Sequence, residues 1–277
     1  MRPALPALLL GAVFIALSPI FVRLSEAGPT ATAFWRVALA LPVLWIFFRG
    51  PLKGPKLLFV AAGIAFAGDL AFWHQAIRFT SVANSTLLAN LASIFVTLAA
   101  WMLWRERPKP LFLVALALAL GGVALLVHTS LSFSGTALLG DALGVVTAMF
   151  YAWYILAVKG LRDRGAATLQ VMAVTSTLTA LILFPVALAS GDQMLPSSAY
   201  GWWILLGLAL ITHAAGQGLI AYALAHLPAT FSSVGLLLQP VVAAFFAWVL
   251  LSEPLVALQI AGGVVVLAAI WLARRAS

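Results

Sequence analysis

Long apolar segments separated by short polar connections dominate this chain, and no connection is long enough to fold as a domain of its own. Only 8% of the 277 residues are charged, whereas soluble domains carry about 25% charged residues. A helix needs about 20 apolar residues to cross the hydrocarbon layer of a membrane. The sequence therefore excludes a water-soluble fold and predicts a membrane protein built almost entirely of spanning segments.

Ten apolar segments are near this length, and few of them contain a charge. Residues 111–127 are apolar on every side, whereas a β-barrel strand alternates lipid-facing and lumen-facing residues. The expected fold class is therefore an all-α membrane protein with ten transmembrane helices. The expected spans are residues 3–22, 30–48, 57–76, 82–104, 111–128, 141–158, 168–189, 202–225, 229–251 and 255–273.

The positive charges fall on one side of this arrangement. Twelve of the 15 Lys and Arg residues lie in segments on the side of the N-terminus, against Arg23 and Arg78 on the other side. Short cytoplasmic connections are enriched in Lys and Arg. Both termini are therefore predicted to be cytoplasmic, in a multi-pass cell (inner) membrane protein. The net charge of +8 is explained by this topology and by contact with anionic lipid, not by nucleic-acid binding.

An internal repeat aligns residues 82–106 with residues 229–253 without a gap, so that Glu106 matches Glu253. In both copies this Glu ends the fourth span of a five-span unit. A unit with an odd number of spans requires that its second copy is inserted upside down. Two inverted repeats are typical of secondary transporters, which bind substrate near mid-membrane between the repeats.

The predicted domains are two five-helix units, residues 1–130 and residues 131–277, the second inverted, around a central cavity. Such a carrier works by alternating access, with kinks expected in the first, fourth, sixth and ninth helices. Pro19 and Pro240 are the hinge candidates, although a static kink is an equal interpretation. Ser93 stands where Pro240 aligns, so the two repeats are expected to kink differently.

The sequence resembles the drug/metabolite transporter superfamily, and within it the ten-span EamA-type exporters. The resemblance covers the whole chain and rests on the doubled span–Glu–span pattern, with WRERP at residues 104–108 and LSEP at residues 251–254. It implies that the first four helices of each repeat enclose the cavity and that the fifth and tenth pack outside. It also implies export of small amphiphilic metabolites, most of all amino acids (including aromatic or neutral ones, as in the YddG-like branch). Export of other metabolites or of cationic drugs is the alternative.

Two formal charges lie well inside spans, Arg36 in the second and Asp69 in the third. Both lie about 10 Å from the outer ends of their helices, at 1.5 Å per residue. A charge within the bilayer costs roughly 3 kcal/mol to insert, so such residues usually pair or line water. The two are interpreted either as a structural ion pair or as charges that meet the substrate or a coupling proton.

Uncharged polar residues inside the spans are the other candidates for lining the cavity. Amides can hydrogen-bond the carboxylate and ammonium groups of an amino acid. His213 and Gln217 share one face of the eighth helix, where they either face the cavity or join two helices. The polar candidates are Asn84, Asn90, His74, His213, Gln217 and Gln239.

Aromatic residues either form belts at the membrane interface or line the cavity, and sequence position does not separate the two roles. The aromatic candidates for the cavity are Trp35, Trp73, Trp101, Tyr151, Tyr154 and Tyr222, with Trp101 and Tyr222 preferred.

No motif of a catalytic or cofactor-dependent protein is present. The chain has no Cys, no HExxH motif, no Walker motif and no convincing Gly-x-Ser-x-Gly elbow, and Asp69 has no second carboxylate beside it inside the spans. The prediction is a non-enzymatic carrier without cofactor, metal or obligate protein partner, which contacts lipid and a small-molecule substrate. An intramembrane enzyme and a channel are the less favoured alternatives, and proton-coupled and facilitated transport are both left open.

Overall fold

The computed structural model describes residues 3–80, 82–105, 107–128, 137–252 and 255–276. Every regular element in these ranges is helical. Nine helical segments there are long and apolar enough to cross a membrane, and the apolar helix α8 (Pro110–Val127) is shorter. The chain is therefore an all-helical membrane protein with ten main helical segments. Glu106 and Glu253 of the predicted repeat motif lie outside the described residues.

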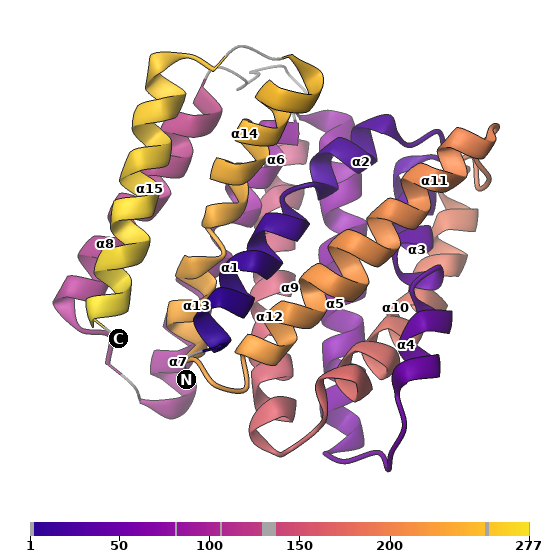
Figure 1. Ribbon diagram of the computed structural model, residues 1–277, viewed down its shortest axis with the longest axis horizontal. Helices are drawn as coiled ribbons and strands as arrows, with labels where there is room; N and C mark the ends of the chain where they lie inside the picture. The colour runs from indigo at the N-terminus through magenta and orange to yellow at the C-terminus, as the bar shows by residue number, and fades with distance from the viewer. Residues whose placement is uncertain (1–2, 81, 106, 129–136, 253–254, 277) are drawn as a thin grey trace.

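Some spans are continuous and others are interrupted near their middle (Figure 1). The continuous helices are α5 (Lys56–Phe79), α9 (Ala137–Asp163), α10 (Thr168–Ala189) and α15 (Ala257–Ala276). The interrupted spans are α1 (Ala4–Ile15) with α2 (Ser18–Leu24), α3 (Pro29–Ala38) with α4 (Leu41–Phe47), α6 (Val82–Ala89) with α7 (Ala92–Trp104), and α13 (Ala229–Gly235) with α14 (Leu238–Leu251).

Proline explains three of the four interruptions. Pro19, Pro42 and Pro240 stand in the first turn of α2, α4 and α14. Proline is tolerated there because the first N–H groups of a helix have no intrahelical partner, whereas it breaks the hydrogen-bond ladder that would continue from the preceding helix. Pro185, by contrast, lies inside the unbroken α10. The kink expected in the sixth span is not found, because α9 runs from Ala137 to Asp163 without interruption.

The fourth span is interrupted without a proline. Asn90 donates from Nδ2 to the Thr86 carbonyl at 2.8 Å, and Ser93 donates from Oγ to the Asn90 carbonyl at 3.0 Å. The same two carbonyls also accept the backbone N–H groups of Asn90 at 3.1 Å and of Ser93 at 3.3 Å, so the side chains add a second hydrogen bond to each. Such side-chain bonds to carbonyls of the preceding turn often bend a helix. Residues 90–91 align on residues 237–238, and α13 and α14 are separated at residues 236–237. The two repeats thus break within one residue of the same aligned position, contrary to the expectation that they differ.

One span contains a different irregularity. Between α11 (Ala199–Gly207) and α12 (Gly218–Ala223), residues Leu208–Gln217 form a π-helical segment. The wider backbone turn is frequent at functional sites. It carries both His213 and Gln217 toward the interior, where each side chain is buried.

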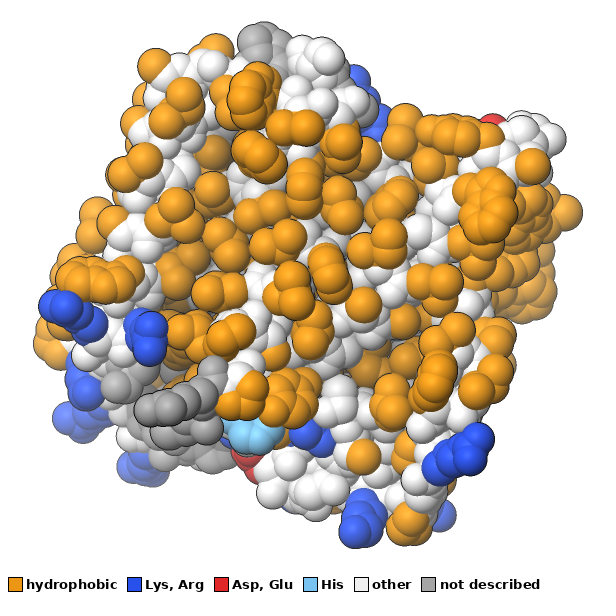
Figure 2. All heavy atoms as spheres, in the orientation of Figure 1, with side chains coloured by type: hydrophobic (Ala, Val, Ile, Leu, Met, Phe, Trp, Pro, Cys, Tyr) orange, Lys and Arg blue, Asp and Glu red, His pale blue; other side chains and the backbone are white. Residues whose placement is uncertain are grey.

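The connections gather at two ends of the bundle. The α2–α3 end carries the α2–α3 and α10–α11 connections, and the α4–α5 end carries the α4–α5 and α9–α10 connections and both chain termini (Figure 1). Hydrophobic side chains cover the face between the two ends, and Lys and Arg side chains gather along the α4–α5 end (Figure 2). This distribution fits a protein whose middle is surrounded by lipid.

Helices α8 and α15 pack against each other at the edge of the bundle (Figure 1). A Cβ added to Gly122 would lie 2.8 Å from the Gly262 carbonyl oxygen, and one added to Gly262 would lie 2.6 Å from the Gly122 oxygen. The two backbones therefore touch, as small residues allow in membrane helix pairs. This peripheral pair corresponds to the fifth and tenth helices, which the family resemblance placed outside the cavity.

Candidate functional site

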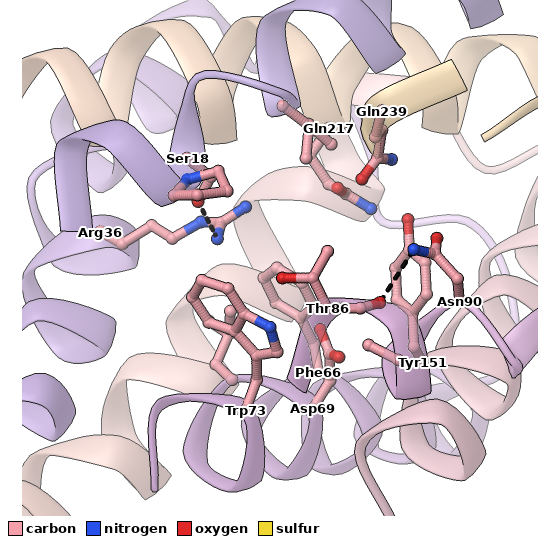
Figure 3. A pocket seen from close by; sticks show the side chains of 14 residues that line it. Ser18, Arg36, Phe66, Asp69, Trp73, Thr86, Asn90, Tyr151, Gln217 and Gln239 are labelled. Carbon is pink, nitrogen blue, oxygen red and sulfur yellow. Dashed lines mark hydrogen bonds between the residues drawn. The ribbon is translucent and has the colours of Figure 1, made fainter. Parts of the chain in front are cut away.

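A cavity of about 100 Å³ lies inside the bundle, between residues of both halves of the chain (Figure 3). Its walls come from α1, α2, α3, α5, α6, the α6–α7 interruption, α9, the π-helical segment and α14; among the described lining residues none belongs to α8, α10 or α15. The lining residues are Ile15, Ser18, Pro19, Arg36, Phe66, Asp69, Leu70, Trp73, Thr86, Ala89, Asn90, Tyr151, Gln217 and Gln239.

The two charges inside the spans both face this cavity. Arg36 is only 5% exposed and donates from Nη1 to the Ser18 hydroxyl at 3.0 Å. Arg36 and Asp69, both described, make no N–O contact within 4.0 Å of each other. The predicted structural ion pair is therefore not formed, and the charges lie apart on the cavity wall.

Three buried hydrogen-bond donors at the cavity have no partner within 3.5 Å in the protein. They are the Nε of Arg36 and the Nε2 atoms of Gln217 and Gln239. An unsatisfied buried donor costs about 1–3 kcal/mol, so such groups normally meet water or a ligand. Asn90 differs, because its Nδ2 bonds the Thr86 carbonyl within its own span.

The two predicted histidines lie behind the wall rather than in it. His213 Nε2 lies 2.7 Å from the Ser176 hydroxyl, which joins the π-helical segment to α10. Its ring stacks on Phe66, with the ring centroids 5.4 Å apart, so Phe66 separates it from the cavity. His74 is fully buried and its Nδ1 lies 2.7 Å from the Leu70 carbonyl of its own helix. The interhelical interpretation thus holds for His213, and neither histidine lines the cavity.

The preferred aromatic candidates are away from the cavity. Trp101 is 48% exposed near the end of α7, so its side chain lies on the outer surface of the bundle. Tyr222 lies in α12 against His226, at the α4–α5 end. Trp35 donates from Nε1 to the Met194 carbonyl at 2.6 Å, which turns its ring toward the α2–α3 end. The side chain of Asn84 lies outside the described part of the structure.

Other aromatic and polar residues form the wall instead. Trp73 and Tyr151 line the cavity, and the ring of Tyr154 stacks on that of Phe66 with the ring centroids 4.6 Å apart. Sequence reasoning missed Phe66 and Thr86, along with Ser18 beside the predicted hinge residue Pro19. Pro19 itself lines the cavity, whereas Pro240 is buried next to the lining residue Gln239. The sequence could have indicated Ser18 as a lining residue, because it lies beside Pro19 at the interruption that this proline creates.

Hydrogen bonds donated to a carboxylate close the α2–α3 end of the bundle. Glu26 accepts from the N–H groups of Ser197 and Ser198 at 2.8 and 2.9 Å, and from their hydroxyls at 2.9 and 2.6 Å. These bonds, above all that of the Ser198 hydroxyl, lower the pKa of Glu26 below its usual 4.5. The ionised carboxylate is therefore the form that holds these contacts.

A second carboxylate strengthens the same closure. Asp192 accepts from the Thr30 N–H at 2.7 Å, at the start of α3, and lies 3.4 Å from Nη1 of Arg78. The Gly28 N–H also donates to the Gln193 carbonyl at 2.9 Å. The contacts that join residues 26–35 to residues 192–198 are called the loop latch below.

The fold and the cavity define a polytopic helical membrane protein whose core contains a cavity lined by both polar and apolar side chains. The profile of the EamA-like transporter family matches the chain twice, over residues 2–128 and again over residues 138–275. The chain belongs to the EamA-like transporter family, within the drug/metabolite transporter superfamily, and is a transporter rather than an enzyme.

Relatives and a solved structure resemble the chain over nearly its full length. An uncharacterized transporter of Archaeoglobus fulgidus is 30% identical, over 91% of each chain. The pseudopaline exporter CntI of Pseudomonas aeruginosa is 27% identical over 95% of this chain and 92% of its own. A probable amino-acid metabolite efflux pump of Salmonella typhimurium is 29% identical over 91% and 88%. A protein of known crystal structure superposes with a TM-score of 0.83 at 15% identity, over 98% and 97% of the two chains, which shows a shared fold.

Proposed function

We propose that this transporter exports small amphiphilic metabolites, most of all amino acids, by alternating access. The observation that carries the proposal is the composition of the cavity wall. Amide, hydroxyl and charged groups share it with the rings of Phe66, Trp73 and Tyr151. An amino acid has a polar head and a side chain that is often apolar, and such a wall offers partners to both.

The size of the cavity supports a mechanism in which the walls move. A volume of about 100 Å³ is below the roughly 300–1,000 Å³ of typical ligand sites. A substrate larger than a few water molecules therefore requires the helices to separate. The interruptions beside Asn90 and near Pro19 and Pro240 lie at or next to the cavity, where backbone dihedrals can change without breaking a continuous ladder.

The two halves act in this proposal as inverted repeats, residues 1–130 and residues 131–277. The spans alternate in direction, so α1 and α9, which begin the halves, start at opposite ends of the bundle. Rocking of the halves about the cavity would then open it to each side in turn. The names of two relatives, a pseudopaline exporter and a probable amino-acid metabolite efflux pump, also favour export of small metabolites.

The α4–α5 end is cytoplasmic in this proposal. It carries the chain termini and connections rich in Lys and Arg, as the positive-inside rule requires. Reporter fusions to the C-terminus test this orientation. A C-terminal reporter that is active only outside the cytoplasm would contradict it.

Counterflow in proteoliposomes tests the function. Purified protein is reconstituted with internal unlabelled amino acids, and uptake of each radiolabelled amino acid is measured. A carrier shows saturation and counterflow, a channel shows neither, and an enzyme changes the solute chemically. Counterflow of quaternary amines without any counterflow of amino acids would replace the proposal with export of cationic drugs.

A further inference from the structure

We infer that Arg36 and Asp69 bind the carboxylate and the cationic nitrogen of one zwitterionic substrate. The inference rests on the function proposed above and names the substrate class of the same cavity. It makes the two in-span charges residues that determine specificity, and it predicts weaker binding of substrates that carry only one of the two charges.

The first support is that two opposite charges, Arg36 buried and Asp69 half-buried, share a cavity without pairing. Arg36 contacts the neutral Ser18 hydroxyl, and no N–O distance to Asp69 is within 4.0 Å, although both residues are described. A charge inside the membrane normally pairs with an opposite charge or faces water. Space between two such charges is filled best by a ligand that carries both complementary charges.

The second support is the distribution of hydrogen-bond donors. Arg36 Nε, Gln217 Nε2 and Gln239 Nε2 are buried donors without a hydrogen-bond partner within 3.5 Å, and all three side chains lie on the wall of the cavity. The two amides interact only weakly with the hydroxyls of Tyr154 and Tyr151. Figure 3 shows these three side chains on one side of the view and Asp69 on the other. A carboxylate has two oxygens and about four acceptor positions, so it can satisfy an arginine and two amides together.

The third support is the surroundings of Asp69. Trp73 lies four residues later on α5, so both side chains project from the same face of that helix into the cavity. A carboxylate accepts hydrogen bonds from an ammonium group, and an indole ring attracts a cation through its face. This part of the wall therefore suits the cationic nitrogen, and the donor side suits the carboxylate.

The test compares three solutes that differ in charge only at their head group. Leucine carries both charges, leucinamide lacks the carboxylate and N-acetylleucine lacks the cation. For the wild-type protein in proteoliposomes, we expect the KM of each derivative to be about 10- to 100-fold above that of leucine, as for the loss of a hydrogen-bonded charge.

The variants Asp69→Asn and Arg36→Gln test separately the binding of the cationic nitrogen and the binding of the carboxylate. Asp69→Asn should raise the KM for leucine by about 10- to 100-fold while leaving that for N-acetylleucine nearly unchanged. Arg36→Gln should raise the KM for leucine by the same factor and leave the KM for leucinamide nearly unchanged. Asp163→Asn and Arg164→Gln, at the α4–α5 end, are the matched charge controls and should behave as wild type.

The outcomes distinguish this inference from the proposed function. Equal KM values for all three solutes in the wild-type protein would overturn the inference while leaving amino-acid export intact, and this comparison needs no variant that might misfold. If the variants are monodisperse but lose transport of all three solutes alike, the two charges have a structural role. This result would also overturn the inference. Absence of counterflow for every amino acid would instead overturn the proposed function.

Discussion

The two ends of the bundle are fastened by different chemistry. At the α2–α3 end, the carboxylates of Glu26 and Asp192 hold the loop latch together with charge-assisted hydrogen bonds. Near the α4–α5 end, neutral groups make the contacts between the halves, such as Gln170 Nε2 with the Lys53 carbonyl at 2.8 Å and Trp45 with Thr177 at 3.0 Å.

The difference indicates which end is harder to open in this conformation. Hydrogen bonds to an ionised group are roughly twice as strong as those between neutral groups. A carrier that alternates must release the loop latch in each cycle, so its strength sets how often the α2–α3 end is open. The chain contains no cysteine, so Ala89→Cys places a single thiol in the cavity wall that reports this opening.

The largest effect is expected for Glu26→Ala in the Ala89→Cys background. Four hydrogen bonds to the carboxylate are lost at once. We expect an impermeant maleimide, added on the side of the α2–α3 end, to label the cavity thiol about tenfold faster. An unchanged rate would mean that the latch does not govern opening.

A smaller increase, about threefold to fivefold in the same labelling assay, is expected for Asp192→Ala. The substitution leaves the Thr30 N–H without its acceptor at the start of α3 and frees Arg78, which is already 44% exposed. Loss of the buried acceptor should also lower the free energy of unfolding by about 1–3 kcal/mol. Asp163→Asn is the control, and equal labelling of both variants would argue against the assignment.

Acid should weaken the loop latch less than either Glu26→Ala or Asp192→Ala does. Because the latch lowers the pKa of Glu26, its contribution is complete above the usual value of 4.5 and is lost as pH falls through the lowered value. Because maleimides react with the thiolate, the labelling rate is divided at each pH by that of free cysteine. This normalised rate should be constant between pH 7 and about pH 5 and rise about twofold to threefold near pH 4. Glu26→Gln has no carboxyl group at this position and should show no such rise; a rise of equal size there would assign it to another group.

The smallest effect is expected at the other end. Gln170→Ala removes one neutral hydrogen bond, and the freed Lys53 carbonyl lies in an exposed connection where water can replace it. Labelling from the α4–α5 side should increase by less than about threefold. An increase larger than that of Glu26→Ala would reverse the comparison between the two ends.

The sequence predicted the polar part of the site better than the aromatic part. Five polar residues were expected at the cavity and line it: Arg36, Asp69, Asn90, Gln217 and Gln239. Exposure of a charged or polar side chain to lipid is unfavourable, so such residues in spans face the interior of the bundle. Aromatic groups are stable both in lipid and in a cavity, and spans that are apolar all round carry no periodicity to separate these faces.

Trp101 and Trp73 illustrate that limit. Both tryptophans lie in long apolar spans, yet one is exposed at the surface and the other faces the cavity. The interruption of the fourth span was hidden for a related reason. Ser93 and Asn90 replace the effect of a proline through hydrogen bonds to carbonyls, and such bonds depend on rotamers that the sequence does not display.

The contact between Gly122 and Gly262 constrains how the halves of the chain can move. Val266 and Leu125 flank the crossing, so neither helix can slide along its partner without a collision of side chains with backbone. If the halves tilt while this crossing is preserved, the crossing is the fixed pivot of the movement. The displacement of each residue then grows with its distance from the crossing. Because the loop latch lies on the opposite side of the bundle (Figure 1), it sits at the far end of this lever arm, where a small rotation produces a wide opening.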